Sequence, residues 1–286
     1  MLTEINKERI LSKYAESWTL SDFKQIAYTS ENGLFTCLST RHGACVLKVH
    51  NSVKEVENEY HTLQAYQHTP FCKVYETDLP NGVLLLEQII PGTRLRVVPD
   101  LDKRLALFCE VFKDLHRKPA DERTYPTYLE WVTGITAYMQ GHKHYEKLTH
   151  QMIKAAQICR LLCEKYTGKF LLHGDLHHDN ILLGENNRYR IIDPKGVMGD
   201  RVFDIPRFIL NEFDEVLNHD FGEKFKYITY IFSKTLAIPE QDIRCLVYIE
   251  MCMAQCWHVE EGQAPNIDHV LFVEKMMRKE HVQCVN

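Results

Sequence analysis

The spacing of hydrophobic residues changes along the chain. Apolar side chains recur at helical spacing over residues 4–17, which predicts an amphipathic helix. Over residues 22–50, short β-rich runs are separated by turn sequences at 31–33 and 41–43, which predicts three antiparallel strands. Two further strands are predicted at residues 72–78 and 83–90. The first part of the chain is therefore expected to be built mainly on a small sheet.

After Pro91 and Gly92, the apolar residues recur mostly with the period of a helix. Predicted helices cover residues 101–116, 127–140, 144–167, 205–217, 222–235, 240–260 and 267–280. Because β-rich segments precede a mainly helical remainder, the pattern predicts an α+β fold with two lobes. Residues 1–90 are expected to form the N-terminal lobe, with a small antiparallel sheet and a leading helix. Residues 91–286 are expected to form the mainly helical C-terminal lobe.

Composition and charge exclude several classes of function. The 286 residues are 45% hydrophobic, which is enough for a substantial core. The net charge of -5 without a basic block argues against nucleic-acid binding. The charged N-terminus and the lack of a long apolar segment favour a soluble, cytoplasmic protein with no membrane partner. The ten scattered cysteines are interpreted as reduced, mostly buried thiols.

The candidate chemistry is concentrated in residues 170–196, where polar residues interrupt short apolar runs. Asp175 is followed by Asn180 five residues later and by Asp193 after a turn-prone segment. Asp175 is suited to accept a proton from a hydroxyl, and Asn180 and Asp193 supply the hard oxygen ligands that Mg²⁺ prefers. Phosphoryl transfer from ATP requires this set, so the stretch is interpreted as the active site of a small-molecule kinase.

An upstream lysine supports the kinase interpretation. Lys48 lies in the apolar strand predicted for residues 45–50, and a helix follows it. In kinases a strand lysine contacts the nucleotide phosphates while a helix glutamate orients its ammonium group. Glu59 is favoured for that role, with Glu55 and Glu57 as alternatives.

Three further residues are weaker candidates for nucleotide binding. Gly33 is placed in the first predicted turn, where a kinase has a loop over the phosphates, although a glycine needed only for the turn is the more common explanation. The strand that ends at Pro91 and Gly92 is interpreted as a connector between the lobes. Backbone groups near Glu87 and Ile89 are expected to bind the adenine edge there.

The histidines of the central stretch raise an alternative, a metal-dependent hydrolase. His173, His177 and His178 lie close together, but the spacing of a helical zinc-binding motif is missing. A role in bracing the loop fits them better. His116, at the end of a predicted helix, is interpreted as a capping residue. Asp204 is interpreted as a scaffold carboxylate.

The motif His-Gly-Asp-Leu-His-His-Asp-Asn at 173–180, followed by Ile-Asp-Pro-Lys-Gly from residue 192, resembles the aminoglycoside phosphotransferase family. The run from 192 to 200 with Phe-Asp-Ile at 203–205 is most similar to the streptomycin 6-kinase and hydroxyurea phosphotransferase branch. The resemblance also covers Val-Leu-Lys-Val at 46–49 and residues 256–262. It implies a bilobal, protein-kinase-like fold with a nucleotide-binding N-terminal lobe.

The resemblance also implies roles for individual residues. Lys48 would contact the ATP phosphates and Glu59 would orient it. Asp175 would be the catalytic base, and Asn180 and Asp193 would bind Mg²⁺. The structural residues would be His173 and Asp204. The chain departs from the usual family form in its His178-Asp179 pair, which leaves Asp179 without a role, and in its few glycines near the phosphate loop.

The acceptor is expected to bind between the catalytic loop and the C-terminal helices. Trp257, Glu260 and Glu261 are the first candidates to contact it, and negative charge there would attract a cationic sugar. Further carboxylates that would add to this potential are Glu212, Asp214 and Glu215. The predicted activity is thus ATP- and Mg²⁺-dependent phosphorylation of an aminoglycoside or related compound, by a monomer or a homodimer. GTP as donor, hydroxyurea or an unrelated metabolite as acceptor, and an inactive nucleotide-binding regulator remain alternatives.

Overall fold

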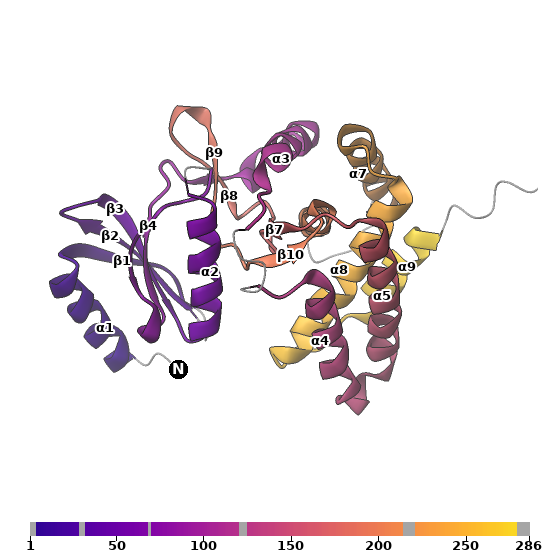
Figure 1. The fold of residues 1–286 in the computed structure, drawn as a ribbon, viewed down its shortest axis with the longest axis horizontal. Helices are drawn as coiled ribbons and strands as arrows, with labels where there is room; N and C mark the ends of the chain where they lie inside the picture. Colours follow the sequence, from indigo (N-terminus) through magenta and orange to yellow (C-terminus); the bar gives the residue numbers. More distant parts are fainter. Residues whose placement is uncertain (1–3, 29–31, 68–69, 120–124, 214–220, 279–286) are drawn as a thin grey trace, which may run out of the picture. The chain divides into compact units, whose positions relative to one another are not determined.

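The computed structural model describes residues 4–28, 32–67, 70–119, 125–213 and 221–278. By their contacts, the residues form two compact units (Figure 1). The first unit comprises residues 1–97 and 179–196, and the second comprises residues 98–178 and 197–286. None of the described helices combines the length and apolar character that a bilayer span requires.

The first unit contains a five-stranded antiparallel sheet in the order β1-β2-β3-β5-β4. Its strands are β1 (Leu20–Tyr28), β2 (Asn32–Ser39), β3 (Gly43–His50), β4 (Val74–Asp78) and β5 (Val83–Glu87). The three predicted N-terminal strands are therefore confirmed. Gly33 is an exception to its predicted placement, because it pairs with Tyr28 and Val49 inside β2 instead of lying in the turn. The strand expected to run to residue 90 ends at Glu87.

Two helices cover opposite faces of this sheet (Figure 1). Helix α1 (Glu4–Ser17) packs its Tyr14 side chain with Leu47 and Val49 of β3 in the core of one face. Side chains alternate between the faces of a strand, so Lys48 points to the other face. Helix α2 (Val53–Ala65) covers that face with Val56, Leu63 and the other buried side chains of its inner stripe.

A small second sheet completes the first unit. Strand β6 (Thr93–Arg94) pairs with β8 (Ile181–Leu183), which forms a hairpin with β9 (Tyr189–Ile191). The amide of Ile191 donates to the carbonyl of Pro70, and the amide of Cys72 donates to the carbonyl of Ile191. Because of these bonds, residues 91–97 and 179–196 belong to the same unit as the large sheet. The sequence had instead indicated a single boundary between the lobes, after residue 90.

The second unit is mainly helical, as predicted. Its helices are α3 (Leu101–Leu115), α4 (Tyr128–Gln140), α5 (Glu146–Lys165), α6 (Pro206–Asn211), α7 (Phe221–Leu236), α8 (Glu240–Glu260) and α9 (Ile267–Arg278). Helix α8 is buried on most of its circumference, so it forms the core against which α4 to α7 and α9 pack. Strands β7 (Phe170–Leu172) and β10 (Val197–Gly199) form an antiparallel pair in this unit. Helix α6 ends at Asn211, earlier than the predicted residue 217.

Candidate functional site

Lys48 is the centre of a buried charge cluster in the first unit. Its side chain is only 6% exposed, and its Nζ atom lies 2.7 Å from Oε2 of Glu59 and 2.6 Å from Oδ1 of Asp193. Among the three glutamates considered for this role, Glu59 is therefore the partner. Glu55 lies one helical turn earlier and contacts His50 instead, at 3.2 Å.

The protonation of this cluster follows from burial and mutual attraction. Burial has the largest influence on the Lys48 ammonium and lowers its pKa, but the Glu59 and Asp193 carboxylates together raise that pKa above its ordinary value. Burial also raises the pKa of Glu59, and the charge of Lys48 opposes this increase. A lysine held between two carboxylates stays charged, as the binding of phosphate groups requires.

Asn180 and Asp193 are brought to the same end of the β8–β9 hairpin. Ile181 pairs with Ile191, and the amide of Ile192 donates to the carbonyl of Asn180 at 3.1 Å. Asp193 follows directly, with a φ of 58°. This left-handed conformation is uncommon for residues other than glycine, and Asp tolerates it better than most. The two side chains together offer the hard oxygen donors that fit Mg²⁺.

Asp179, to which the sequence assigned no role, is bound by Arg96, which belongs to the same unit. Nε of Arg96 lies 3.0 Å from both carboxylate oxygens, and Nη2 lies 2.9 Å from Oδ2. Because Asp179 directly precedes Asn180, this forked contact fastens the start of the hairpin to the segment that follows β6.

A double-mutant cycle measures the Arg96–Asp179 contact. Arg96→Met, Asp179→Asn and the double variant are expected to show a coupling free energy near 1 kcal/mol, the upper end for partly exposed pairs. Urea unfolding provides the measurement. Arg94→Met is the control, because Arg94 is 64% exposed and only approaches Asp179 to 3.8 Å. Strictly additive single effects would contradict the contact.

The other three residues predicted to bind the nucleotide lie in different surroundings. The Glu87 carboxylate lies 2.7 Å from Nη2 of Arg190 and accepts the amide of Lys73. Ile89 follows β5 and is buried. Gly33 lies in β2 beside β3. Their roles toward a nucleotide stay predictions.

In the second unit, Asp204 holds the backbone of the loop that contains Asp175. Its carboxylate accepts the backbone amides of His173 and Gly174, each at 2.8 Å, and lies 2.8 Å from Nε2 of His116. His116 therefore contacts Asp204, which the capping interpretation did not foresee. Gly174 has a φ of 79°, so a side chain at this position would be strained. The amide of Asp175 donates to Nδ1 of the fully buried His173.

The Asp175 side chain meets residues that the sequence analysis missed. Its Oδ1 atom lies 3.0 Å from Nε of Arg207, and the same Nε lies 3.0 Å from Oε1 of Glu250. The Arg207 guanidinium stacks 4.4 Å from the ring centre of Trp257, which packs against Trp131. A sequence signal existed for Glu250, because a carboxylate inside the apolar helix α8 requires a buried partner.

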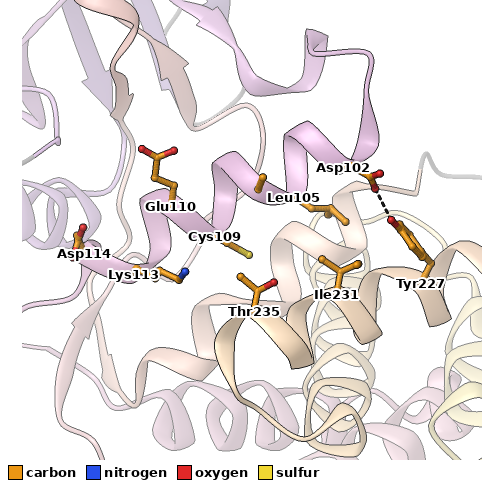
Figure 2. Close-up of a pocket in the computed structure, with 10 residues that line it drawn as sticks. Asp102, Leu105, Cys109, Glu110, Lys113, Asp114, Tyr227, Ile231 and Thr235 are labelled. Carbon is orange, nitrogen blue, oxygen red and sulfur yellow. Dashed lines mark hydrogen bonds between the residues drawn. The ribbon is translucent and has the colours of Figure 1, made fainter.

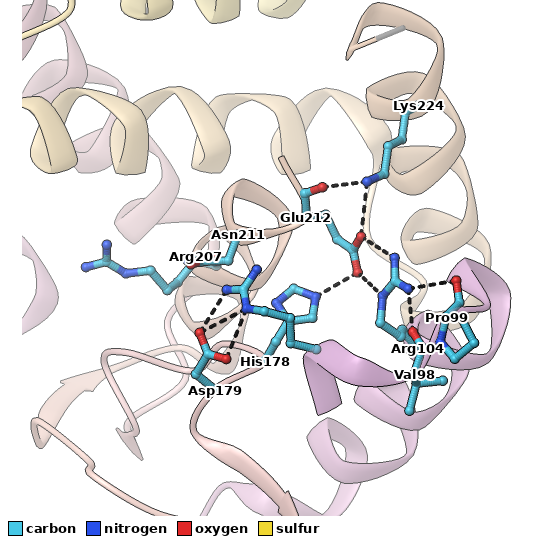
Figure 3. Close-up of polar contacts among 10 residues, drawn as sticks. Val98, Pro99, Arg104, His178, Asp179, Arg207, Asn211, Glu212 and Lys224 are labelled. Carbon is cyan, nitrogen blue, oxygen red and sulfur yellow. Dashed lines mark hydrogen bonds and ion pairs between the residues drawn. The ribbon is translucent and has the colours of Figure 1, made fainter. Parts of the chain in front are cut away.

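Glu212 does not add free negative charge near the catalytic loop. It is buried, and its carboxylate lies 2.7 Å from Nη2 of Arg104, 2.7 Å from Nε2 of His178 and 3.2 Å from Nζ of Lys224 (Figure 3). Burial favours a raised pKa for Glu212, but Arg104 and His178 hold it well below its ordinary value. The charge is therefore balanced locally.

Glu260 and Glu261, also expected to contribute negative charge, do not contact Asp175 among the described residues. Both are exposed at the end of α8. Burial and the charge of Glu261 raise the pKa of Glu260. Asp214 and Glu215 lie outside the described residues.

A cavity of about 510 Å³ lies between α3 and α7 (Figure 2). Leu105, Cys109 and Ile231 contribute apolar surface, and the Tyr227 hydroxyl donates to Asp102 at its edge. None of the predicted site residues is among the described residues that line it. The size of the cavity therefore does not identify the candidate active site.

The histidines of the loop have partners other than a metal. Within the described ranges, no group of three or more His, Cys, Asp and Glu side chains is arranged to hold a metal ion. His178 contacts Glu212, and His177 lies 3.6 Å from Oδ2 of Asp175. These contacts are typical of a braced loop.

Comparisons with known proteins agree with this arrangement. The model of the aminoglycoside/hydroxyurea antibiotic resistance kinase family matches residues 17–262. Hydroxyurea phosphotransferase of Kitasatospora aureofaciens is 25% identical over 218 residues, which cover 73% of this chain and 61% of the relative. Streptomycin 6-kinase of Streptomyces griseus is 25% identical over 151 residues, 50% of this chain and 47% of the relative. The chain thus spans less than two thirds of these relatives.

Solved structures show the fold. A thermostable mutant of aminoglycoside phosphotransferase APH(4)-Ia, in a ternary complex with AMP-PNP and hygromycin B, aligns with a TM-score of 0.64 and 14% identity. That alignment covers 94% of this chain and 96% of the other. Choline kinase LicA from Streptococcus pneumoniae aligns with a TM-score of 0.67 and 16% identity over 95% and 98% of the two chains. The predicted protein-kinase-like α+β fold is confirmed, and the chain belongs to the aminoglycoside/hydroxyurea antibiotic resistance kinase family.

Proposed function

We propose that this protein transfers the γ-phosphate of ATP to a hydroxyl group of a small molecule, with Mg²⁺ as cofactor. The observation that carries the proposal is the buried Lys48, held between Glu59 and Asp193. A structural ion pair needs only one carboxylate. An ammonium held by a helix glutamate and a hairpin aspartate is the arrangement that kinases use to bind nucleotide phosphates.

The residues of the first unit would bind and orient the donor. Lys48 would contact the phosphate oxygens, and Glu59 would hold its ammonium in position. Asn180 and Asp193 would hold Mg²⁺, which when bound neutralises charge on the phosphate oxygens. GTP is the alternative donor.

Asp175 would serve as the base. The acceptor oxygen forms a bond to the γ-phosphorus, the bond from that phosphorus to the bridging oxygen of ADP breaks, and the hydroxyl proton passes to Asp175. Asp204 and His173 would support this step by fixing the loop backbone on both sides of Gly174. Most of the rate enhancement would come from positioning and charge stabilisation.

Replacing Asp193 with asparagine tests the metal and nucleotide site. We expect the affinity for Mg-ATP to fall about ten-fold or more in calorimetric titrations, since about 1.4 kcal/mol corresponds to a factor of ten. Asp22→Asn, on an exposed residue of β1, is the matched control. Unchanged Mg-ATP affinity in Asp193→Asn would count against the assignment.

The identity of the acceptor can be tested by a screen for turnover. ADP release would be measured with ATP and with GTP against aminoglycosides, hydroxyurea, sugars and amino alcohols. Streptomycin and hydroxyurea belong in this panel because two relatives are named for them. Binding of Mg-ATP without transfer to any compound would favour an inactive nucleotide-binding regulator.

A further inference from the structure

Arg207, on the first turn of α6, links the Asp175 loop to the buried helix α8. Its Nε atom lies 3.0 Å from Oδ1 of Asp175 and 3.0 Å from Oε1 of Glu250. The Arg207 side chain is 19% exposed and that of Glu250 is 5% exposed. Two carboxylates from distant segments, one in a loop and one in a helix, therefore share a single guanidinium group.

Helix α8 holds this guanidinium group in two ways. The central carbon of the group lies 4.4 Å from the ring centre of Trp257, and that ring packs against Trp131 of α4. The Glu250 carboxylate, which contacts Nε of Arg207, also accepts the Tyr128 hydroxyl at 3.4 Å. Stacking fixes the plane of a guanidinium group, and an ion pair with a buried carboxylate fixes its direction. Arg207 is thus held in position independently of the loop that contains Asp175.

The charges of this cluster depend on one another. Burial has the largest influence on Arg207 and lowers its pKa, but Glu250 and Asp175 together raise that pKa above its ordinary value. Burial also raises the pKa of Glu250, while Arg207 opposes this increase and Asp175 adds to it. Without Arg207, two carboxyl groups would face each other in a buried site, which both desolvation and like charge disfavour.

The backbone on either side of Asp175 is fixed by other groups. Asp204 accepts the amides of His173 and Gly174, and the amide of Asp175 donates to His173. These bonds place the backbone of Asp175 but do not restrict the rotation of its side chain. A general base must hold its oxygen within hydrogen-bond reach of the acceptor hydroxyl, so the ion pair with Arg207 provides a restraint that the loop lacks.

We propose that Arg207 is a positioning residue for phosphoryl transfer: held by Glu250 and Trp257, it fixes the orientation in which the Asp175 carboxylate meets the acceptor hydroxyl. It acts through Asp175 and not by contact with the acceptor. This assignment rests on the proposed function, because it takes Asp175 as the base.

Turnover of Arg207→Met, measured as ADP release per folded enzyme, tests the assignment. We expect kcat to fall about ten-fold or more with little change in KM for Mg-ATP or the acceptor, because the base is misplaced while the substrates still bind. Arg207→Lys should recover part of the loss, since it keeps the charge without the planar group. Arg244→Met is the matched control. Arg244 is a buried arginine of α8 that pairs with Glu240 at 3.0 Å, so its loss should lower stability without lowering kcat.

The same substitution in an Asp175→Asn background shows whether Arg207 acts through the base. Once the base is absent, a residue that only positions it has no further effect on kcat, so the two losses should be strongly non-additive. A residue that merely supports the fold would lower turnover by the same factor in both backgrounds.

A second variant guards against unfolding. Removing Arg207 alone leaves the Glu250 carboxylate buried beside Asp175, whereas Arg207→Met/Glu250→Gln removes both charges together. This double variant should fold, as checked by circular dichroism, and should show the same loss of kcat as Arg207→Met.

The outcomes separate the assignment from the proposed function. Unchanged or higher kcat in the folded double variant, or equal fold-losses from Arg207→Met with and without Asp175, would overturn the role of Arg207 and leave the kinase function in place. Absence of ADP release by the wild type with every compound in the acceptor panel would contradict the proposed function itself, and with it the assignment.

Discussion

Replacing Asp175 with asparagine is expected to lower phosphoryl transfer by about 10²–10⁴-fold, the usual contribution of a positioned general base. Asparagine keeps the shape of the side chain but cannot accept the proton. Lys48, Asn180 and Asp193 stay intact, so the affinity for Mg-ATP should change little. ADP release with the acceptor found in the screen, together with calorimetry, separates the two effects.

Asp114→Asn is the matched control, because Asp114 is exposed near the end of α3. It makes the same chemical change away from the catalytic loop and should retain wild-type turnover. Transfer at a near-normal rate in Asp175→Asn would remove Asp175 from the role of base. Loss of nucleotide affinity equal to the loss of turnover would instead indicate a general disturbance of the protein.

Replacing Lys48 with methionine is expected to lower the free energy of unfolding by about 3–5 kcal/mol, the range measured when one partner of a buried ion pair is removed. Glu59 is 5% exposed and would lose its cation. Urea unfolding followed by circular dichroism provides the measurement. Mg-ATP affinity should fall as well, because the phosphate contact is lost.

The double variant Lys48→Met/Glu59→Leu should recover most of the lost stability, because an apolar pair can replace a buried ion pair at little cost. It should not recover Mg-ATP affinity. Lys24→Met, on the exposed part of β1, is the control for the change of side chain. A loss below about 1 kcal/mol in Lys48→Met would show that water reaches Glu59 and that the pair is weaker than its burial indicates.

Much of the architecture was predictable because local patterns carry it. Period-two and helical spacing indicated the strands β1 to β3 and most helices, since these patterns reflect which side of an element faces the core. Boundaries were less predictable. Gly33 pairs inside β2, and β5 ends at Glu87, because strand pairing with β3 sets both limits.

The candidate site was also only partly predictable from the sequence. The motif around Asp175, Asn180 and Asp193 was visible because its residues lie within a short segment. The partners of that motif were harder to find. Arg207 and Glu250 are far from Asp175 in the chain, and the apolar pattern of α8 only indicated that Glu250 needs some partner.

The sequence by itself determined the order of β-rich and helical parts, the lysine on a strand before a helix, and the family motif at residues 173–180. Only the tertiary structure decided that Glu59 and not Glu55 contacts Lys48, and that Arg96 binds Asp179. It also showed that Glu212, one of the carboxylates expected to attract a cationic acceptor, is neutralised by Arg104, His178 and Lys224. The reason is physical: periodicity records which face of an element is buried, whereas an ion pair depends on which side chains from distant segments meet there.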